Sequence, residues 1–303
     1  MDWDLFAEEL RKTAPDLELL REEPMSRHTT FRVGGPVSLL AVARTEGEVK
    51  AALRVAANYG IEPFFLGNGS NLLVADAGYD GFLVKLAGEL NQIRDVKGEL
   101  VAGGAVLLSR LANAALDRGL TGLEFASGIP GTVGGAVTMN AGAYGGEISQ
   151  ILRRVKAISL TGEVEMIPVE HCDLSYRHSA FDHGKHLILE AGFRLEQGDR
   201  EAIQATMTDL AARRKEKQPL EYPSAGSTFK RPQGHFAAAL IDQCGLKGLT
   251  VGGAQVSEKH AGFVINRGGA TCNDILELVE QIKSRVWDSA GVKLELEVKV
   301  LGV

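Results

Sequence analysis

The chain has 303 residues, of which 45% are hydrophobic and 24% are charged, as in a soluble globular protein of two or three domains. Its net charge is −6 and it has no long basic run, so we exclude nucleic acid as a partner. No apolar stretch approaches membrane-spanning length, and the acidic N-terminus does not resemble a signal peptide. The three cysteines, Cys172, Cys244 and Cys272, are odd in number and far apart, which indicates a reducing compartment. We therefore expect a cytoplasmic protein, with no membrane insertion and no obligate protein partner.

Alternating helix and strand signals run along the whole chain. In the first region, to about residue 88, we expect a helix with Leu5, Phe6 and Leu10 on one face, a strand over 38–43, a helix that begins at a Thr45/Glu48 capping box and stops at Gly60, and a strand over 61–66. In the second, to about residue 197, we expect a helix over 108–118, a hairpin of strands 154–160 and 163–169, and a strand over 187–195 returning beside it. In the third, we expect helices over 199–217 and 235–244, strands over 227–230 and 262–266, a helix capped by Thr271 and Asp274 that ends at Gly291, and a last strand over 294–300. The pattern predicts an α+β protein with mixed sheets.

Two glycine-rich segments are the most informative part of the sequence. The first glycine segment, residues 67–72, reads Gly-Asn-Gly-Ser-Asn-Leu, and the second glycine segment, residues 127–147, contains seven glycines and a single charged residue. Glycine costs stability inside an element, so such clusters suggest backbone N–H groups brought close to an anion. Together the segments predict one extended phosphate-bearing ligand. The alternative is a pair of tight turns beside closely packed elements.

Neither segment fits the commonest nucleotide motifs. In the first, Leu72 stands where a dinucleotide fingerprint has its last glycine, and a strand rather than a helix follows. The second lacks the Gly-Lys-Ser/Thr ending of a P-loop.

Three further segments carry reactive side chains, namely residues 175–179, residues 224–230 and the last strand, where period-two spacing puts Glu295 and Glu297 on one face. The sequence around Ser227 is not the Gly-x-Ser-x-Gly of a hydrolase. Taken alone, Arg177 could be a surface ion-pairing residue, Ser227 a cap and Glu297 a solvated charge. The nearby histidines do not have the spacing of metal ligands and favour a polar loop over a metal site; they are His171, His178, His183 and His186.

In their order and spacing, these motifs resemble the UDP-N-acetylenolpyruvoylglucosamine reductase family over nearly the whole chain. The likeness rests on residues 30–35 (TFRVGG), 67–71 (GNGSN), 128–131 (GIPG), 140–145 (NAGAYG), 175–177 (SYR), 225–227 (AGS), 240–244 (LIDQC) and 294–298 (LELEV). It implies an FAD-binding fold of the vanillyl-alcohol-oxidase (PCMH) type in two subdomains, residues 1–88 and 89–197. An α+β substrate-binding domain, residues 198–303, would follow, with a last strand that can return to the flavin site. Only 49 residues separate Arg177 from Ser227, which is typical of the shorter class of the family, without the inserted segment that closes over the substrate in longer members.

The resemblance also implies an activity, that of a UDP-N-acetylmuramate dehydrogenase in peptidoglycan precursor synthesis. NADPH would reduce non-covalent FAD, and hydride from flavin N5 would then reduce the enolpyruvyl ether of a UDP-sugar. Arg177 and Glu297 would stabilise the enol intermediate, and Ser227 would protonate it. The implied cofactor-binding residues are Arg32, Gly67, Asn68, Gly69, Ser70, Asn71, Leu72, Ser127, Gly128, Ile129, Pro130, Gly131, Gly134, Asn140, Gly142 and Lys299. The implied substrate contacts are Tyr144, Tyr176, Lys230 and Gln243.

Two other functions stay open at this point. Another FAD-dependent oxidase or dehydrogenase of the same fold would act on a sugar or an alcohol, and such enzymes often tether flavin through His or Cys. No His or Cys lies between His28 and His171, so we expect dissociable FAD. A non-enzymatic nucleotide-binding module would not need Arg177, Ser227 and Glu297 to converge.

Overall fold

The computed structural model describes all 303 residues, and their contacts divide them into two compact units. Unit 1 contains residues 1–21, 39–68 and 81–213, and unit 2 contains residues 22–38, 69–80 and 214–303. The chain therefore passes from one unit to the other inside the first glycine segment. The subdomain boundaries expected after residues 88 and 197 stay a prediction.

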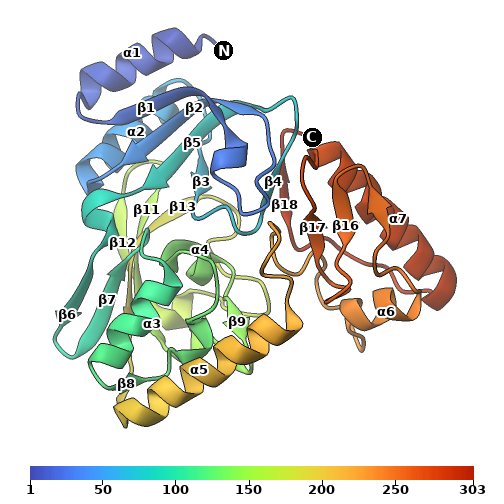
Figure 1. The fold of residues 1–303 in the computed structure, drawn as a ribbon. Helices are drawn as coiled ribbons and strands as arrows, with labels where there is room; N and C mark the ends of the chain where they lie inside the picture. Colours follow the sequence, from blue (N-terminus) through green and yellow to red (C-terminus); the bar gives the residue numbers. More distant parts are fainter. The chain divides into compact units, whose positions relative to one another are not determined.

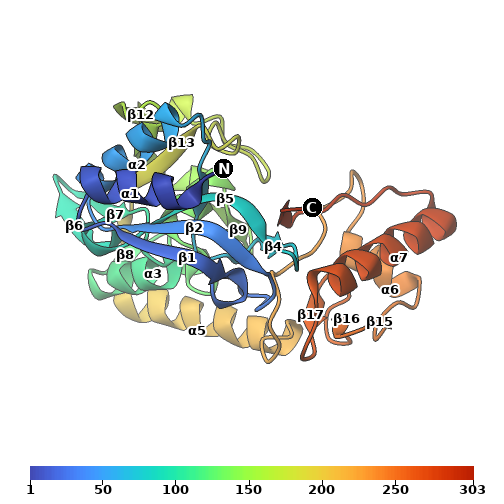
Figure 2. The same cartoon turned by 90° about the horizontal axis from the view of Figure 1, so that it is seen from above.

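A five-stranded antiparallel sheet forms one half of unit 1 (Figure 1). Its strands, in spatial order, are β12 (Val164–Pro168), β11 (Leu152–Ser159), β13 (His186–Phe193), β7 (Glu99–Gly103) and β6 (Ile93–Val96). The helices of this half are α3 (Leu108–Asp117), the short α4 (Val133–Thr138) and α5 (Arg200–Lys217), and α5 lies beside α3 in both views (Figures 1 and 2). The small two-stranded pairs are β8 (Leu120–Thr121) with β14 (Glu196–Gln197), and β9 (Gly142–Ala143) with β10 (Gly146–Glu147). Apolar residues of α3, α4 and this sheet share one core, and α4 thereby holds the second glycine segment against the sheet.

The other half of unit 1 is built on a four-stranded sheet. Its strands, in spatial order, are β1 (Glu18–Pro24), β2 (Pro36–Ala43), β5 (Tyr79–Leu86) and β3 (Phe64–Leu66), and the ends of three of them run into unit 2. Helices α1 (Trp3–Thr13) and α2 (Glu46–Asn58) lie side by side (Figure 2) and share a core with this sheet. β3 pairs in parallel with β5, and its end delivers the first glycine segment.

Unit 2 has its own apolar core, which contains the buried face of the long helix α7 (Cys272–Ala290) and part of α6 (Ala237–Gln243). A three-stranded antiparallel sheet packs against α7, with β15 (Thr250–Val251), β16 (Ala254–Val256) and β17 (Val264–Asn266) (Figure 2). The last strand, β18 (Lys299–Leu301), pairs in parallel with β4 (Leu72–Val74). The C-terminal segment is thereby joined to the residues that follow the first glycine segment.

Most elements agree with expectation, and the caps agree in detail. The Thr271 hydroxyl accepts from the N–H of Asp274, whose carboxylate accepts from the N–H of Thr271, and Gly291 closes α7 in the left-handed conformation. The hairpin of β11 and β12 and the return of β13 beside it are also confirmed. None of the helices combines the length and the apolar character needed to span a membrane.

Several expectations about strands were wrong. Residues 227–230 and 294–298 do not form strands, because their pairing is limited to one isolated bridge between Phe229 and Leu296. The strand expected over 61–66 begins only at Phe64, after Pro63, which has no N–H to donate to a ladder.

Two helix expectations also need correction. Leu5 is 50% exposed, because α1 buries a stripe formed by Phe6, Ala7 and Leu10 instead. The second glycine segment, where no helix was expected, contains the helix α4, whose first turn is capped by Thr132.

Candidate functional site

The two glycine segments meet in unit 1. The side-chain amide of Asn68 donates to the carbonyl of Pro130, 62 positions further along the chain, over 2.6 Å. Gly67 lies so close to Thr132 that a Cβ on it would come within 2.8 Å of the threonine Oγ1. The two segments lie far apart in the sequence, and the fold brings them into contact.

Close packing explains part of the glycine content of the second segment. Gly134 donates its N–H to the carbonyl of Gly104 over 2.9 Å, and a Cβ on Gly134 would come within 3.2 Å of that carbonyl. Gly131 accepts from the N–H of Leu108 over 3.0 Å. A Cβ on Gly142 would come within 2.8 Å of the carbonyl of Gly146, across the β9–β10 turn. These glycines let α4 and its flanking turns approach the neighbouring backbone, which is the packing alternative raised from the sequence.

The first glycine segment has the donors that an anion needs. Its carbonyls are used: Gly69 accepts from the N–H of Thr30 over 3.1 Å, and Asn71 accepts from the N–H of Lys299 over 3.1 Å. The four consecutive N–H groups of residues 68–71 donate no hydrogen bond within the chain. Consecutive N–H groups without a protein acceptor form the kind of concavity that binds phosphate. These residues therefore fit the pyrophosphate of a dinucleotide.

Within unit 2, hydrogen bonds connect the first glycine segment to the backbone of Glu297. The side-chain amide of Asn71 donates to the backbone carbonyl of Glu297 over 3.0 Å. The N–H of Glu297 donates to the carbonyl of Thr228, next to Ser227, over 2.9 Å. Ser227 is exposed and Glu297 is half-buried. Two residues expected in catalysis thus lie on neighbouring segments of one unit.

The expected ligand residues of unit 2 have mixed surroundings. The N–H of Lys230 donates to the carbonyl of Glu295 over 2.9 Å, and its ammonium lies 3.8 Å from the carboxylate of the same residue. Arg32 is exposed, in the left-handed conformation (φ +55°), at the turn that follows Thr30. Gln243 is exposed at the C-terminal end of α6. Their roles toward substrate or cofactor stay predictions.

In unit 1, Tyr176 and Arg177 occupy the tip of a tight turn. The backbones of Ser175 and His178 exchange two hydrogen bonds of 3.1 Å across it. Arg177 has φ +55°, an uncommon conformation for a residue other than glycine, and its guanidinium lies 5.2 Å from the centre of the Tyr176 ring. The buried amide of Asn140 donates to the carbonyl of Ser175 over 3.1 Å. The turn is therefore attached to the second glycine segment.

The same segment contributes two other expected site residues. Ser127 donates its hydroxyl to the carbonyl of Glu124 over 2.8 Å, within its own turn. Tyr144 is 47% exposed at the β9–β10 turn, again with a positive φ.

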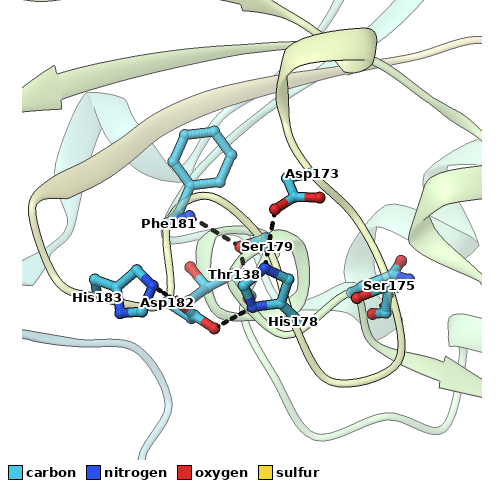
Figure 3. A network of polar contacts seen from close by, with 9 residues as sticks. Thr138, Asp173, Ser175, His178, Ser179, Phe181, Asp182 and His183 are labelled. Carbon is cyan, nitrogen blue, oxygen red and sulfur yellow. Dashed lines mark hydrogen bonds and ion pairs between the residues drawn. The ribbon is translucent and has the colours of Figure 1, made fainter.

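A polar network around His178, the residue that follows Arg177 in the chain, was not predicted as functional (Figure 3). His178 Nδ1 lies 2.6 Å from Asp182 Oδ2, and His178 Nε2 lies 3.1 Å from Asp173 Oδ2. Hydrogen bonds to Asp173 and to Asp182 raise the pKa of His178 above its ordinary value, and the bond to Asp173 has the larger effect. The available signal was the spacing, with aspartates five residues before and four residues after a histidine that directly follows Arg177.

The other histidines behave differently. His183 Nε2 lies 3.2 Å from Asp182 Oδ1, at the edge of the network, whereas His186 packs edge-on against Phe181 and His171 is exposed. No group of three or more His, Cys, Asp or Glu side chains in the chain could hold a metal ion.

The expected site residues fall in both units. Unit 1 carries Arg177, Tyr176, Tyr144, Asn140, Gly67, Asn68 and the second glycine segment, and unit 2 carries Ser227, Glu297, Lys230, Gln243, Arg32, Lys299 and residues 69–72. The convergence of Arg177 with Ser227 and Glu297 stays a prediction.

Comparisons with known proteins match both halves of the chain. A family model described as the C-terminal domain of UDP-N-acetylenolpyruvoylglucosamine reductase matches residues 218–301, and one described as an FAD binding domain matches residues 37–167. A UDP-N-acetylenolpyruvoylglucosamine reductase of Clostridium botulinum (strain Hall) is 49% identical over 94% of this chain and 92% of its own. Its counterpart from Clostridium kluyveri is 47% identical over 98% of this chain and 97% of its own.

A solved structure is also similar. The crystal structure of UDP-N-acetylenolpyruvylglucosamine reductase from Thermus caldophilus has a TM-score of 0.81 and 37% identity, and the match covers 94% of this chain and 98% of that one. Together with the family models, it confirms the expected α+β fold with an FAD-binding part.

Proposed function

We propose that this chain, which belongs to the UDP-N-acetylenolpyruvoylglucosamine reductase family, reduces the enolpyruvyl ether of its UDP-sugar substrate to the lactyl ether, UDP-N-acetylmuramate. NADPH is the electron donor and FAD the cofactor. The observation that carries this proposal is the pair of hydrogen bonds in unit 2 that link Asn71 to Glu297 and Glu297 to Thr228. These bonds connect the first glycine segment, which is suited to a pyrophosphate, with Glu297 and with the residue next to Ser227, the two residues of unit 2 that we assign to the reaction.

The chain's own groups suit non-covalent FAD. The N–H groups of residues 68–71 would hold the pyrophosphate, with the turn at 128–131 held beside Asn68 by its bond to Pro130. No His or Cys that could form a covalent tether lies between His28 and His171. When bound and reduced by NADPH, the flavin supplies the hydride that adds to the terminal carbon of the enolpyruvyl group.

Arg177 and Glu297 would bind the carboxylate of the enolpyruvyl group. Negative charge moves onto its oxygens as hydride arrives, and donors already aimed at that position lower the barrier because they bind the transition state more strongly than the substrate. The guanidinium of Arg177 fits a carboxylate with two parallel hydrogen bonds. A protonated Glu297 would donate one more. Tyr176, beneath the guanidinium, and Tyr144, Lys230 and Gln243 are the proposed contacts to the rest of the substrate.

Ser227 would complete the reaction by donating its hydroxyl proton to the neighbouring carbon. The enolate that hydride addition leaves is a strong base at that carbon, so a hydroxyl is acidic enough. Hydride and proton together add across the carbon–carbon double bond, and the serine regains its proton from solvent. The exposed position of Ser227 allows this last step.

Product analysis tests the proposal. Incubation of the protein with FAD, NADPH and UDP-N-acetylenolpyruvoylglucosamine should convert the sugar to a product heavier by two hydrogen atoms, with one NADPH consumed for each product. Mass spectrometry and the absorbance of NADPH measure both quantities. Consumption of NADPH that does not depend on the sugar, with the sugar recovered unchanged, would count against the proposal.

A further inference from the structure

The side chain of His178 is held between two carboxylates. A neutral imidazole has one N–H and can donate to one acceptor, whereas the imidazolium donates from both nitrogens. Here Nδ1 faces Asp182 over 2.6 Å and Nε2 faces Asp173 over 3.1 Å (Figure 3). The geometry therefore selects the charged ring.

This ring connects the two arms of the Arg177 turn. Asp173 lies before the turn and Asp182 lies after it, while the backbone of His178 exchanges hydrogen bonds with Ser175 across it. The positive φ of Arg177 costs conformational energy that surrounding contacts must offset. Loss of one carboxylate contact would remove one of the contacts that hold the turn in this conformation.

A further bond anchors the turn below the ring. The hydroxyl of Ser179 donates to the carbonyl of Thr138, at the end of α4, over 2.7 Å and accepts from the N–H of Phe181 over 3.1 Å. The two arms of the turn are thereby fixed to the second glycine segment, at Ser179 by this bond and at Ser175 by the amide of Asn140, and the imidazolium ties the flanking aspartates to the turn between them.

We propose that His178, as an imidazolium held by Asp173 and Asp182, is a positioning residue for Arg177 in the reduction of the enolpyruvyl group. The inference rests on the proposed function, because it assigns His178 the task of keeping the guanidinium aimed at the substrate carboxylate. It also makes the second half-reaction, the reoxidation of flavin by substrate, dependent on the charge of His178.

The direction of the pH dependence follows from the surroundings of the ring. The titratable groups that face it are Asp173, Asp182 and His183, whose ring centre lies 6.4 Å away. The turn contacts the second glycine segment through the carbonyl of Thr138, which bonds Ser179, and the amide of Asn140, which bonds Ser175, and neither group titrates. The two aspartates raise the pKa of His178, so the imidazolium is complete below the ordinary histidine pKa and is lost as pH rises through the raised value. Reoxidation should therefore slow as pH rises through that value.

The main test compares the two half-reactions in the FAD-loaded His178→Gln variant. Glutamine donates from one amide nitrogen and stays uncharged at every pH. A displacement of about 1 Å can cost about 100-fold in rate, and we expect reoxidation by substrate to slow about 10- to 100-fold, with bleaching by NADPH unchanged. The variant should also lack the wild-type fall in rate at high pH. His178→Arg, a permanent cation with donors for both carboxylates, should recover part of the rate without that fall.

The matched control is His171→Gln, at an exposed histidine of the same segment, and it should match the wild type in both steps. If the His178→Gln variant does not fold, the same measurements are made on Asp173→Asn, which removes one of the two carboxylates at a side chain that is 78% exposed. An NMR titration of the His178 ring in the FAD-loaded protein should show a pKa raised above the ordinary histidine value.

Three results would overturn the inference. The first is reoxidation of the His178→Gln variant at the wild-type rate with the wild-type pH profile, and the second is a His178 pKa that is not raised. The third is equal slowing of both half-reactions, because it would indicate a structural role. Failure of the wild type to be reoxidised by the substrate is a different result, since it would remove the proposed function itself.

Discussion

The hydrogen bond between Asn68 and Pro130 makes a quantitative prediction about cofactor affinity. Asn68→Ala removes the side-chain hydrogen bond of 2.6 Å that joins the two glycine segments in unit 1. We expect the segments to separate more often in the apoprotein, so FAD must order them as it binds. FAD affinity should therefore fall while the fold is retained.

The magnitude follows from the exposure of this bond. A neutral hydrogen bond contributes about 0.5–1.5 kcal/mol, and the Asn68 bond is solvent-exposed, so water can replace the lost donor at Pro130. No buried group is left without a partner, which keeps the effect near the middle of that range. About 1 kcal/mol corresponds to about a fivefold rise in the dissociation constant of FAD, within a range of about two- to tenfold.

Titration of the flavin-free protein with FAD, followed by flavin fluorescence, measures that constant. The control is Asn113→Ala, which removes an exposed amide-to-carbonyl bond of 2.9 Å within α3, away from both glycine segments. It should leave FAD affinity at the wild-type value. Unchanged affinity in the Asn68→Ala variant, or an equal loss in both variants, would refute the reasoning.

Two other predictions concern single side chains. Ser227→Ala should slow reoxidation of flavin by substrate about 10²- to 10⁴-fold and leave bleaching by NADPH nearly intact, because only the second step needs a proton donor. Ser227→Cys should recover part of the rate. Equal slowing of the two steps in stopped-flow traces would remove Ser227 from the mechanism. Burial raises the pKa of the Cys172 and Cys272 thiols to about 11, so both are protonated at neutral pH. In the native protein, an aromatic disulfide reagent should therefore react quickly only with the half-buried Cys244. Rapid modification of all three thiols without unfolding would contradict this.

Local signals in the sequence predicted local structure well. Thr271 and Asp274 satisfy each other's backbone N–H groups, so a cap can be recognised without knowledge of the rest of the fold. The Thr161-Gly162 turn likewise fixed the hairpin of β11 and β12, where Gly162 has a positive φ. In both cases the interacting residues lie close together in the sequence.

Long-range pairing was the part that the sequence could not supply. The alternation of Leu294, Glu295 and Leu296 is real, since Leu294 is buried and Glu295 exposed, yet it led to a strand over 294–300 where only Lys299–Leu301 is one. Whether an extended segment forms a ladder depends on its partner, and the partner of β18 is β4, more than 220 residues away.

The candidate site shows the same division. The resemblance drew attention to Asn140 as a cofactor residue, and the structure shows its amide donating to Ser175 and accepting from Ser149 over 2.9 Å. The contacts of His178 with Asp173 and Asp182 depend on the path of the loop, which no local rule predicts. The sequence was enough to identify candidate residues, whereas their hydrogen-bond partners could be identified only from the fold.

Anaerobic stopped-flow spectroscopy of the FAD-loaded wild type is the most direct test of the account. NADPH should bleach the flavin absorption, and UDP-N-acetylenolpyruvoylglucosamine, added to the reduced protein without oxygen, should restore it in full. Recovery with this sugar and not with UDP-N-acetylglucosamine, which lacks the enolpyruvyl group, is the result that we predict. Flavin that stays bleached in the presence of the enolpyruvyl sugar would contradict the central claim.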